Sequence, residues 1–155
     1  AGFAGPLEVR QFKGGQSNPT YKLITPSHEY VLRRKPPGKL LKSAHAVDRE
    51  YRAITALHTT GFPCPKTYCL CEDESVTGTM FYIMDFVDGR ILWEPMLPQC
   101  DPDERAAIYD AMNETLARLH SVDYEAIGLG DFGKPGNYFA RQIGRWSKQY
   151  PLSEL

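Results

Sequence analysis

Three short strand-like segments follow one another in the first 34 residues, and their succession restricts the fold more than any other feature. They span residues 7–12, 20–25 and 29–34. Strands that follow one another this closely are typical of an antiparallel meander. Because side chains alternate along a strand, Val31 and Arg33 are expected on one face of the third segment.

The next part of the chain alternates between breaks and regular structure. The sequence KPPGK at 35–39 predicts a turn, because proline removes a backbone donor and restricts the residue before it. A helix is expected over residues 44–58, with Ser43 as its N-cap. Two further strands are expected over residues 66–71 and 80–86.

A long helix is predicted to begin at Pro102. Asp101 is a suitable N-cap, proline is favoured at the first helical position, and Glu104 follows three residues after the cap. We expect one face of this helix to be buried, because the following side chains recur at helical spacing. They are Ile108, Met112, Thr115 and Leu119.

The order of these elements predicts an α+β fold. Three strands, a helix and two strands would form an antiparallel-sheet lobe over residues 1–88. The long helix would then begin a helical lobe, of which residues 89–155 are the first part.

The amino-acid composition of the chain restricts the kinds of ligand and partner that we expect it to bind. The net charge is −1, but residues 1–60 carry ten Lys or Arg against four Asp or Glu, and residues 61–155 carry eight against fifteen. A basic first part suits an anionic ligand, although a solvated basic face also explains the bias. No apolar run approaches the roughly 18 residues of a membrane span, so no membrane partner is expected. The four cysteines lack zinc spacing and are expected to be reduced thiols.

A glycine-bearing loop joins the first two strands. It consists of Gly14, Gly15, Gln16, Ser17 and Asn18. Glycine lets backbone N–H groups approach a phosphate closely, so the loop is a candidate phosphate-binding loop. It matches neither G-x-G-x-x-G nor the Walker pattern, and two glycines also suit an ordinary hairpin turn. From the loop alone both alternatives stay open.

A basic and an acidic residue form a second candidate constellation. Glu50 falls in an otherwise apolar stripe of the first predicted helix. A carboxylate on a buried face needs a partner, and Arg33, or failing that Arg34, is the candidate. The alternative is that Glu50 lies at the edge of the stripe and reaches water. In protein kinases a basic residue on this strand contacts the α- and β-phosphates and is held by a glutamate of the next helix.

The third candidate is the sequence FYIMDFVDG. A strand of large apolar residues that leads into a turn is where kinase-like folds place the hinge that binds the adenine edge. Asp85, Phe86 and Val87 are the expected hinge positions. The alternative is an ordinary core strand followed by a turn.

Taken together, the segments carry a resemblance to a known superfamily. They read GGQSNPTY, YVLRRKPPG, LLKSAHAVDREY, GTMFYIMDFVDGR and RAAIYDAMNETLARLHSVD. Their combination resembles the kinase-like phosphotransferases of the aminoglycoside phosphotransferase and choline kinase superfamily. More narrowly, it resembles the phosphotransferase domain found fused to, or encoded alongside, certain acyl-CoA dehydrogenases. The resemblance covers about residues 9–150.

The resemblance implies a two-lobed protein-kinase-like fold, ATP and Mg²⁺ as co-substrates, and phosphate transfer to a hydroxyl group. For the narrower family it implies a hydroxyacyl-CoA as acceptor and a functional link to an acyl-CoA dehydrogenase. Carried over by position, residues 14–18 are the phosphate loop and Arg33 takes the place of the usual strand lysine. Glu50 orients Arg33, and residues 85–87 are the hinge.

The catalytic parts of that family are expected outside this segment. Its HGD…N loop and a following Asp-bearing strand orient the acceptor and bind magnesium. None of the four histidines here begins such a motif. The DFG sequence at 131–133 follows a long helix rather than a catalytic loop, so Asp131 is not expected to bind magnesium. No catalytic or metal-binding residue is therefore expected in this segment, which we interpret as the front portion of a longer enzyme.

The leading hypothesis is an ATP-dependent small-molecule kinase that acts on ATP and a small hydroxylated substrate. The alternatives are a catalytically silent binding module of the same fold and an aminoglycoside- or choline-type kinase. Nucleic-acid binding by the basic cluster is a weaker option, since prolines interrupt the cluster and aromatic residues are missing from it. That cluster is Arg33, Arg34, Lys35, Lys39 and Lys42. The expected location is the cytoplasm of a bacterium, with an organelle as the alternative in a eukaryote.

Overall fold

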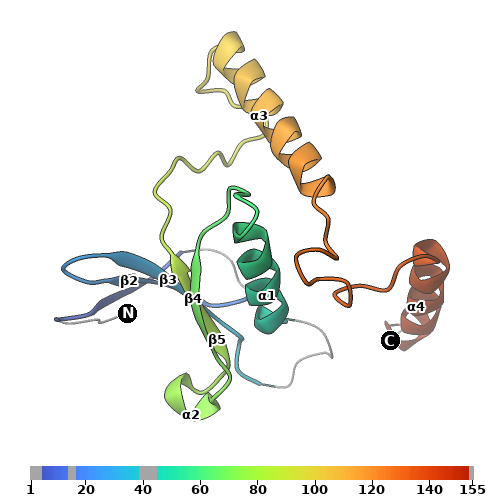
Figure 1. Cartoon of the computed structure of the whole chain (residues 1–155), viewed down its shortest axis with the longest axis horizontal. Coiled ribbons are helices and arrows are strands. Elements are labelled where there is room, and N and C mark those ends of the chain that lie inside the picture. Colours follow the sequence, from blue (N-terminus) through green and yellow to red (C-terminus); the bar gives the residue numbers. More distant parts are fainter. Residues whose placement is uncertain (1–4, 14–16, 39–44, 154–155) are drawn as a thin grey trace. The chain divides into compact units, whose positions relative to one another are not determined.

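The computed structural model describes residues 5–13, 17–38 and 45–153. Residues 1–122 and 123–155 form two compact units. The first unit contains β1 (Glu8–Gln11), β2 (Thr20–Ile24), β3 (Glu29–Arg34), α1 (Val47–His58), β4 (Thr67–Cys71), α2 (Glu74–Thr77), β5 (Phe81–Asp85) and α3 (Pro102–His120), and the second contains α4 (Tyr138–Ser153) (Figure 1).

The five predicted strands are all present, and they form one antiparallel sheet in the order β1-β2-β3-β5-β4. Each strand begins and ends within one residue of its predicted bounds. The predicted meander of the first three strands is confirmed. The central strands β3 and β5 bring Val31 opposite Met84 and Arg33 opposite Tyr82, so all four side chains lie on the same face of the sheet.

Helix α1 packs on that face, against β4 and β5 (Figure 1). Its first residue, Val47, is fully buried, and Tyr82 of β5 is almost fully buried. The rings of Tyr51 and Tyr82 lie 6.0 Å apart in a tilted arrangement. These contacts place the core of the first unit between α1 and the two central strands.

The predicted start of α1 at residue 44 is wrong. The helix begins at Val47, its N-cap is Ala46, and no side chain in the described part of the chain caps it. His45 has a φ of 57°, in the left-handed region, and a right-handed helix cannot continue through such a residue. The expected cap, Ser43, lies outside the described residues.

Two helices were not predicted. The short α2 has the side chain of Asp73 as its N-cap, which accepts a hydrogen bond from the Ser75 N–H. It ends at Gly78, whose φ of 86° suits glycine. The other is α4, which contains Pro151 near its C-terminal end. Periodicity missed α2 because a single helical turn is too short to show it.

Helix α3 begins as predicted. The Asp101 carboxylate accepts a hydrogen bond from the Glu104 N–H at 2.8 Å, and Pro102 occupies the first turn. The predicted burial of one face is wrong, since Met112 is 60% exposed and Leu119 is also exposed. Within the described part of the chain, only the loop at Phe62 adds to the apolar groove along this face.

The second unit is small and has little core. Leu129 is buried in the loop before α4. Helix α4 exposes large apolar side chains, among them Trp146, which is 65% exposed.

None of the helices that the structure describes combines the length and the apolar character that crossing a bilayer requires.

Replacement of Val47 by alanine tests the position of the core. We expect Val47→Ala to lower the free energy of unfolding by about 1–3 kcal/mol, because it removes two methyl groups from a fully buried site. Urea unfolding followed by circular dichroism measures the effect. The matched control is Val76→Ala, at a side chain 59% exposed, which should change the free energy by less than about 0.5 kcal/mol. Equal effects of the two variants would contradict this description of the core.

Candidate functional site

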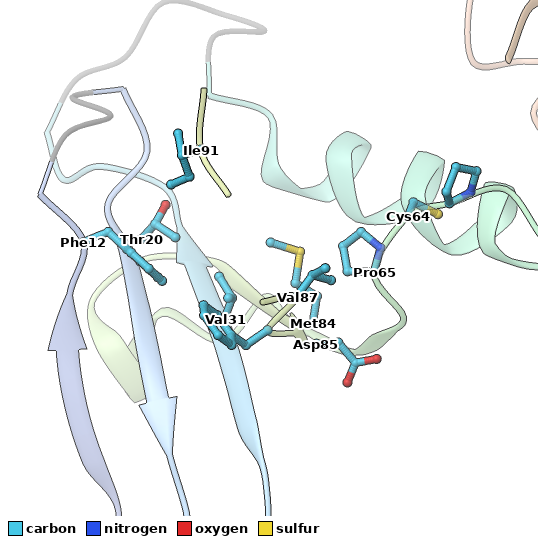
Figure 2. A pocket seen from close by; sticks show the side chains of 11 residues that line it. Phe12, Thr20, Val31, Cys64, Pro65, Met84, Asp85, Val87 and Ile91 are labelled. Atoms are coloured by element: carbon cyan, nitrogen blue, oxygen red, sulfur yellow. The ribbon is translucent and has the colours of Figure 1, made fainter. Parts of the chain in front are cut away.

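An open pocket of about 680 Å³ lies at the end of the sheet, between the loop after α1 and the segment that follows β5 (Figure 2). Its walls are predominantly apolar, with few polar side chains. The lining residues are Phe12, Thr20, Val31, Pro63, Cys64, Pro65, Met84, Asp85, Phe86, Val87 and Ile91. A flat apolar group of a ligand could lie between these walls.

The strand register builds the floor of this pocket. Val31 and Met84 are directly opposite each other on β3 and β5, and both contribute to the lining. The rings of Phe12 and Phe86 stack with centroids 6.4 Å apart, and the Lys22 ammonium lies 3.7 Å from the centroid of Phe86. The stacked pair closes one side of the pocket with aromatic surface.

The predicted hinge residues lie at the rim of the pocket. Asp85 ends β5, and its N–H donates to the carbonyl of Lys66 at 2.9 Å. The N–H of Phe86 donates to the carbonyl of Glu29 at 3.3 Å. Among the described residues, neither the N–H nor the carbonyl of Val87 takes part in a backbone hydrogen bond. Val87 therefore offers one donor and one acceptor to the edge of a planar heterocycle.

The side chain of Asp85 is directed away from the pocket (Figure 2). Its carboxylate accepts a hydrogen bond from the hydroxyl of Tyr68 and lies 3.1 Å from Nε2 of His28. Burial alone would raise the pKa of Asp85, but these hydrogen bonds outweigh it and lower the pKa below its usual value. The same bond raises the pKa of Tyr68 to about 12. Asp85 thus contributes its backbone to the pocket and its side chain to the opposite face of the sheet.

Arg33 and Glu50 form an ion pair between β3 and α1. The Arg33 Nε donates to Oε2 of Glu50 at 2.7 Å, and each side chain is about one-third exposed. The hydroxyl of Tyr82 donates to the same oxygen at 3.2 Å. Burial, reinforced by the Glu50 charge, raises the pKa of Tyr82 well above its ordinary value. Tyr82 therefore stays protonated and remains a donor to Glu50.

Asn18 joins this ion pair from the end of the glycine-bearing loop. Its side-chain nitrogen donates to Oε1 of Glu50 at 3.0 Å, and the residue is only 4% exposed. Its backbone carbonyl accepts a hydrogen bond from the hydroxyl of Thr20 at 2.9 Å. The Thr20 oxygen in turn accepts from Nη1 of Arg33 at 3.2 Å. The four residues Asn18, Thr20, Arg33 and Glu50 form a closed ring of hydrogen bonds, which we name the β2-β3-α1 ring.

Sequence reasoning missed three residues around Glu50: Tyr82, described above, and Thr20 and His45. Thr20 bridges Asn18 and Arg33 within the ring, and His45 places Nδ1 2.9 Å from Oδ1 of Asn18. The register of the second and third predicted strands could have indicated Thr20, since it lies directly opposite Arg33. No local pattern indicates His45, which lies 27 residues from Asn18 in the chain.

The remaining predicted phosphate-loop residues are only partly covered by the structure. Gly14, Gly15 and Gln16 lie outside the described residues, and Ser17 is exposed. Lys39 and Lys42 of the basic cluster also lie outside them. Two of the three described members have internal partners: Arg33 is held by Glu50, and Nε of Arg34 donates to the Thr79 hydroxyl at 3.0 Å.

The described residues do not provide a metal site. No group of three or more His, Cys, Asp or Glu side chains in the described ranges is arranged to hold a cation. All four cysteines are free thiols, and Cys64 lies in the pocket lining. Burial raises the pKa of the Cys64 thiol, so this part of the wall is uncharged at neutral pH.

Nearly the whole chain, residues 8–155, matches a single family model of known proteins. The family model described as "Phosphotransferase enzyme family" matches these residues. In the crystal structure of a "putative aminoglycoside phosphotransferase" from Ralstonia eutropha JMP134, the similar part is 61% identical and has a TM-score of 0.83. The match covers 99% of this chain and 44% of that chain.

Among curated proteins, the chain is similar to parts of much longer acyl-CoA dehydrogenase relatives. It is 50% identical over 150 residues to acyl-CoA dehydrogenase family member 10 of Mus musculus, covering 97% of this chain and 14% of that protein. It is 46% identical over 144 residues to acyl-CoA dehydrogenase family member 11 of Homo sapiens, covering 93% and 18%. The chain thus spans less than one-fifth of the length of these relatives.

Removal of the Tyr68 hydroxyl tests the contact that holds Asp85, the first predicted hinge residue. We expect Tyr68→Phe to raise the pKa of Asp85, because the carboxylate loses its hydrogen-bond donor. Titration of the Asp85 carboxyl carbon by NMR measures this change. The matched control is Tyr109→Phe, which removes a hydroxyl that donates to the Pro95 carbonyl instead.

The same substitution predicts a pH dependence of stability. A lowered carboxyl pKa stabilises the folded state above the unfolded value of about 3.9, and this contribution is lost as the pH falls through the folded value. The wild type should therefore be more stable than Tyr68→Phe above about pH 5, and the difference should shrink below about pH 4. A difference that is independent of pH would contradict the assignment.

Proposed function

This chain belongs to the phosphotransferase enzyme family, and from that premise we propose that it is the nucleotide-binding part of an ATP-dependent kinase that phosphorylates a hydroxyl group. Residues 1–88 would form the nucleotide-binding lobe and residues 89–155 the beginning of the substrate lobe. The observation that carries the proposal is the Arg33–Glu50 ion pair on the same sheet face as the apolar hinge pocket.

The pocket fits an adenine ring. Val31 and Met84 supply apolar contact. The N–H and carbonyl of Val87, which form no backbone hydrogen bond with the described residues, match the alternating donors and acceptors at the edge of the base. Arg33 lies two residues along β3 from Val31, on the same face of the sheet. With the base at Val87, the phosphates of ATP would extend along β3 toward Arg33.

Arg33 has donors to offer a phosphate. A guanidinium carries five N–H groups, and the structure accounts for two of them, one to Glu50 and one to Thr20. Within the described ranges no residue accepts a hydrogen bond from the other three, which could bind phosphate oxygens. Arginine differs here from the usual lysine by its planar fork, which Glu50 and Thr20 together orient. Fixed positive charge aimed at a phosphoryl group stabilises the charge of the transition state.

Magnesium is the usual co-substrate ion of such reactions, but the described residues do not form a site for it. We therefore assign no step to the metal within this chain. Its ligands, and the residue that orients the acceptor hydroxyl, are expected in parts of the enzyme beyond these residues.

We propose a hydroxyacyl-CoA as the acceptor. The proposal is supported by the similarity of this chain to parts of proteins named acyl-CoA dehydrogenase family members 10 and 11. A phosphotransferase joined to a dehydrogenase would act on related thioesters. Phosphorylation of a hydroxyacyl thioester would convert its hydroxyl into a better leaving group. A functional link to an acyl-CoA dehydrogenase follows from this assignment.

Two assays on the full-length protein test the proposal. Isothermal titration with ATP and magnesium should give saturable binding, and a phosphate-transfer assay over hydroxyacyl-CoA thioesters, aminoglycosides and choline should give turnover with the thioesters. Binding of ATP without turnover on any acceptor would favour a catalytically silent module. Absence of ATP binding would overturn both nucleotide assignments.

Substitution of Arg33 tests its proposed role. Arg33→Ala should lower kcat by about 10²–10³-fold, the size expected when one charged donor to a transition state is lost. Arg33→Lys should keep part of the activity, because it retains the charge but loses the fork. The matched control is Arg34→Ala, whose side chain contacts Thr79 rather than Glu50. Comparable losses in both alanine variants would argue against a specific role for Arg33.

A further inference from the structure

We propose that His45 is a positioning residue for phosphate transfer, acting through Asn18 and Glu50 to hold Arg33 in place. The inference rests on the proposed function for its catalytic consequence. It assigns a role to a residue that neither the strand pattern nor the kinase-like comparison indicated. The observations that carry it are a short hydrogen-bond chain, the burial of its central member, and the backbone conformation of His45.

The hydrogen bonds determine which atoms face each other. The carboxylate of Glu50 can only accept, so the amide nitrogen of Asn18 faces Glu50, at 3.0 Å. The amide oxygen of Asn18 then faces Nδ1 of His45, at 2.9 Å. An oxygen accepts, and therefore Nδ1 of His45 must carry the proton and donate it. The direction of donation runs from His45 through Asn18 to Glu50.

The burial of Asn18 makes the hydrogen bonds from His45 through Asn18 to Glu50 important. Asn18 is only 4% exposed, so water cannot readily replace a partner that its amide loses. Without the His45 donor, the Asn18 oxygen would be a buried acceptor with no remaining side-chain partner among the described residues. The amide would then reorient, and Glu50 would lose the donor that holds Oε1. Arg33, which is held at Oε2 of the same carboxylate, would become less well oriented.

The backbone of His45 connects this chain to the start of α1. His45 has a φ of 57°, and its carbonyl accepts a hydrogen bond from the N–H of Val47 at 2.9 Å. Among the described residues no side chain caps α1, and His45 connects the beginning of the helix to Asn18. Glu50 lies on the first turn of that helix. One residue thus links the position of the glutamate to the position of Asn18.

Three variants separate the donor from the backbone conformation. His45→Asn keeps both, because asparagine tolerates positive φ and its amide nitrogen can occupy the place of Nδ1. His45→Gly keeps the backbone conformation but removes the donor. Arg33→Ala removes the residue on which the chain is proposed to act.

Steady-state kinetics of the full-length protein with ATP, magnesium and a hydroxyacyl-CoA measures the catalytic consequence. We expect His45→Gly to lower kcat at least about tenfold while the KM for ATP changes less than about threefold, and His45→Asn to stay within about threefold of wild type. In the double variant with Arg33→Ala, His45→Gly should cause no further loss, since its effect passes through Arg33. A further tenfold loss in the double variant, or equal loss in the Asn and Gly variants, would overturn the proposal.

A second measurement does not depend on turnover. The Nε–H signal of Arg33 in ¹⁵N NMR spectra reports its bond to Glu50. It should shift or broaden in His45→Gly and remain at its wild-type position in His45→Asn. An unchanged signal in His45→Gly would overturn the positioning role itself. If the signal responds as expected but the wild-type protein transfers no phosphate, the proposed function fails and with it the catalytic part of this inference, while the positioning role stands.

Discussion

The ion pair between Arg33 and Glu50 is the interaction on which the first unit depends. Each charge is about one-third exposed and lies where β3 meets α1, so neither is fully solvated and each needs the other. Their pairing determines how α1 sits on the sheet, because Glu50 is also bound by Tyr82 from β5 and by Asn18 from the loop before β2. A single carboxylate therefore connects two strands, a loop and a helix.

The two faces of β5 perform different tasks at its end. Met84 faces the pocket, whereas the carboxylate of the next residue, Asp85, is bound by Tyr68 and His28 on the opposite face. The alternation of side chains along a strand makes this division possible. The backbone after Asp85 therefore lies at the rim of the pocket. The hydrogen bonds to the Asp85 side chain on the opposite face of the sheet fix its direction. Such an arrangement suits recognition of a planar ring by main-chain groups, which do not change with side-chain rotamer.

The helices that follow the sheet, α3 and α4, each have an exposed apolar face. Met112 of α3 and Trp146 of α4 expose much of their apolar surface, and no element within the described ranges covers either face. The matched part of the Ralstonia eutropha structure is 44% of that chain. Under the proposed function, the groups described here belong to the nucleotide side of a phosphotransferase.

Local patterns in the sequence determined much of the fold. The alternation in β3 placed Val31 and Arg33 on one face, and the helical period placed Glu50 in the stripe that meets it, since both patterns depend only on neighbours along the chain. Periodicity also predicted a buried face for α3, and this was wrong because burial requires a covering partner that periodicity does not supply.

Only the tertiary structure decided what completes the site. It closed the β2-β3-α1 ring through Thr20, brought His45 to Asn18 across 27 residues, and started α1 three residues later than its helical pattern predicted. These features depend on a left-handed residue at His45 and on side chains that meet through folding. Hydrogen bonds between distant residues leave no periodic trace in a sequence, because nothing along the chain relates their positions.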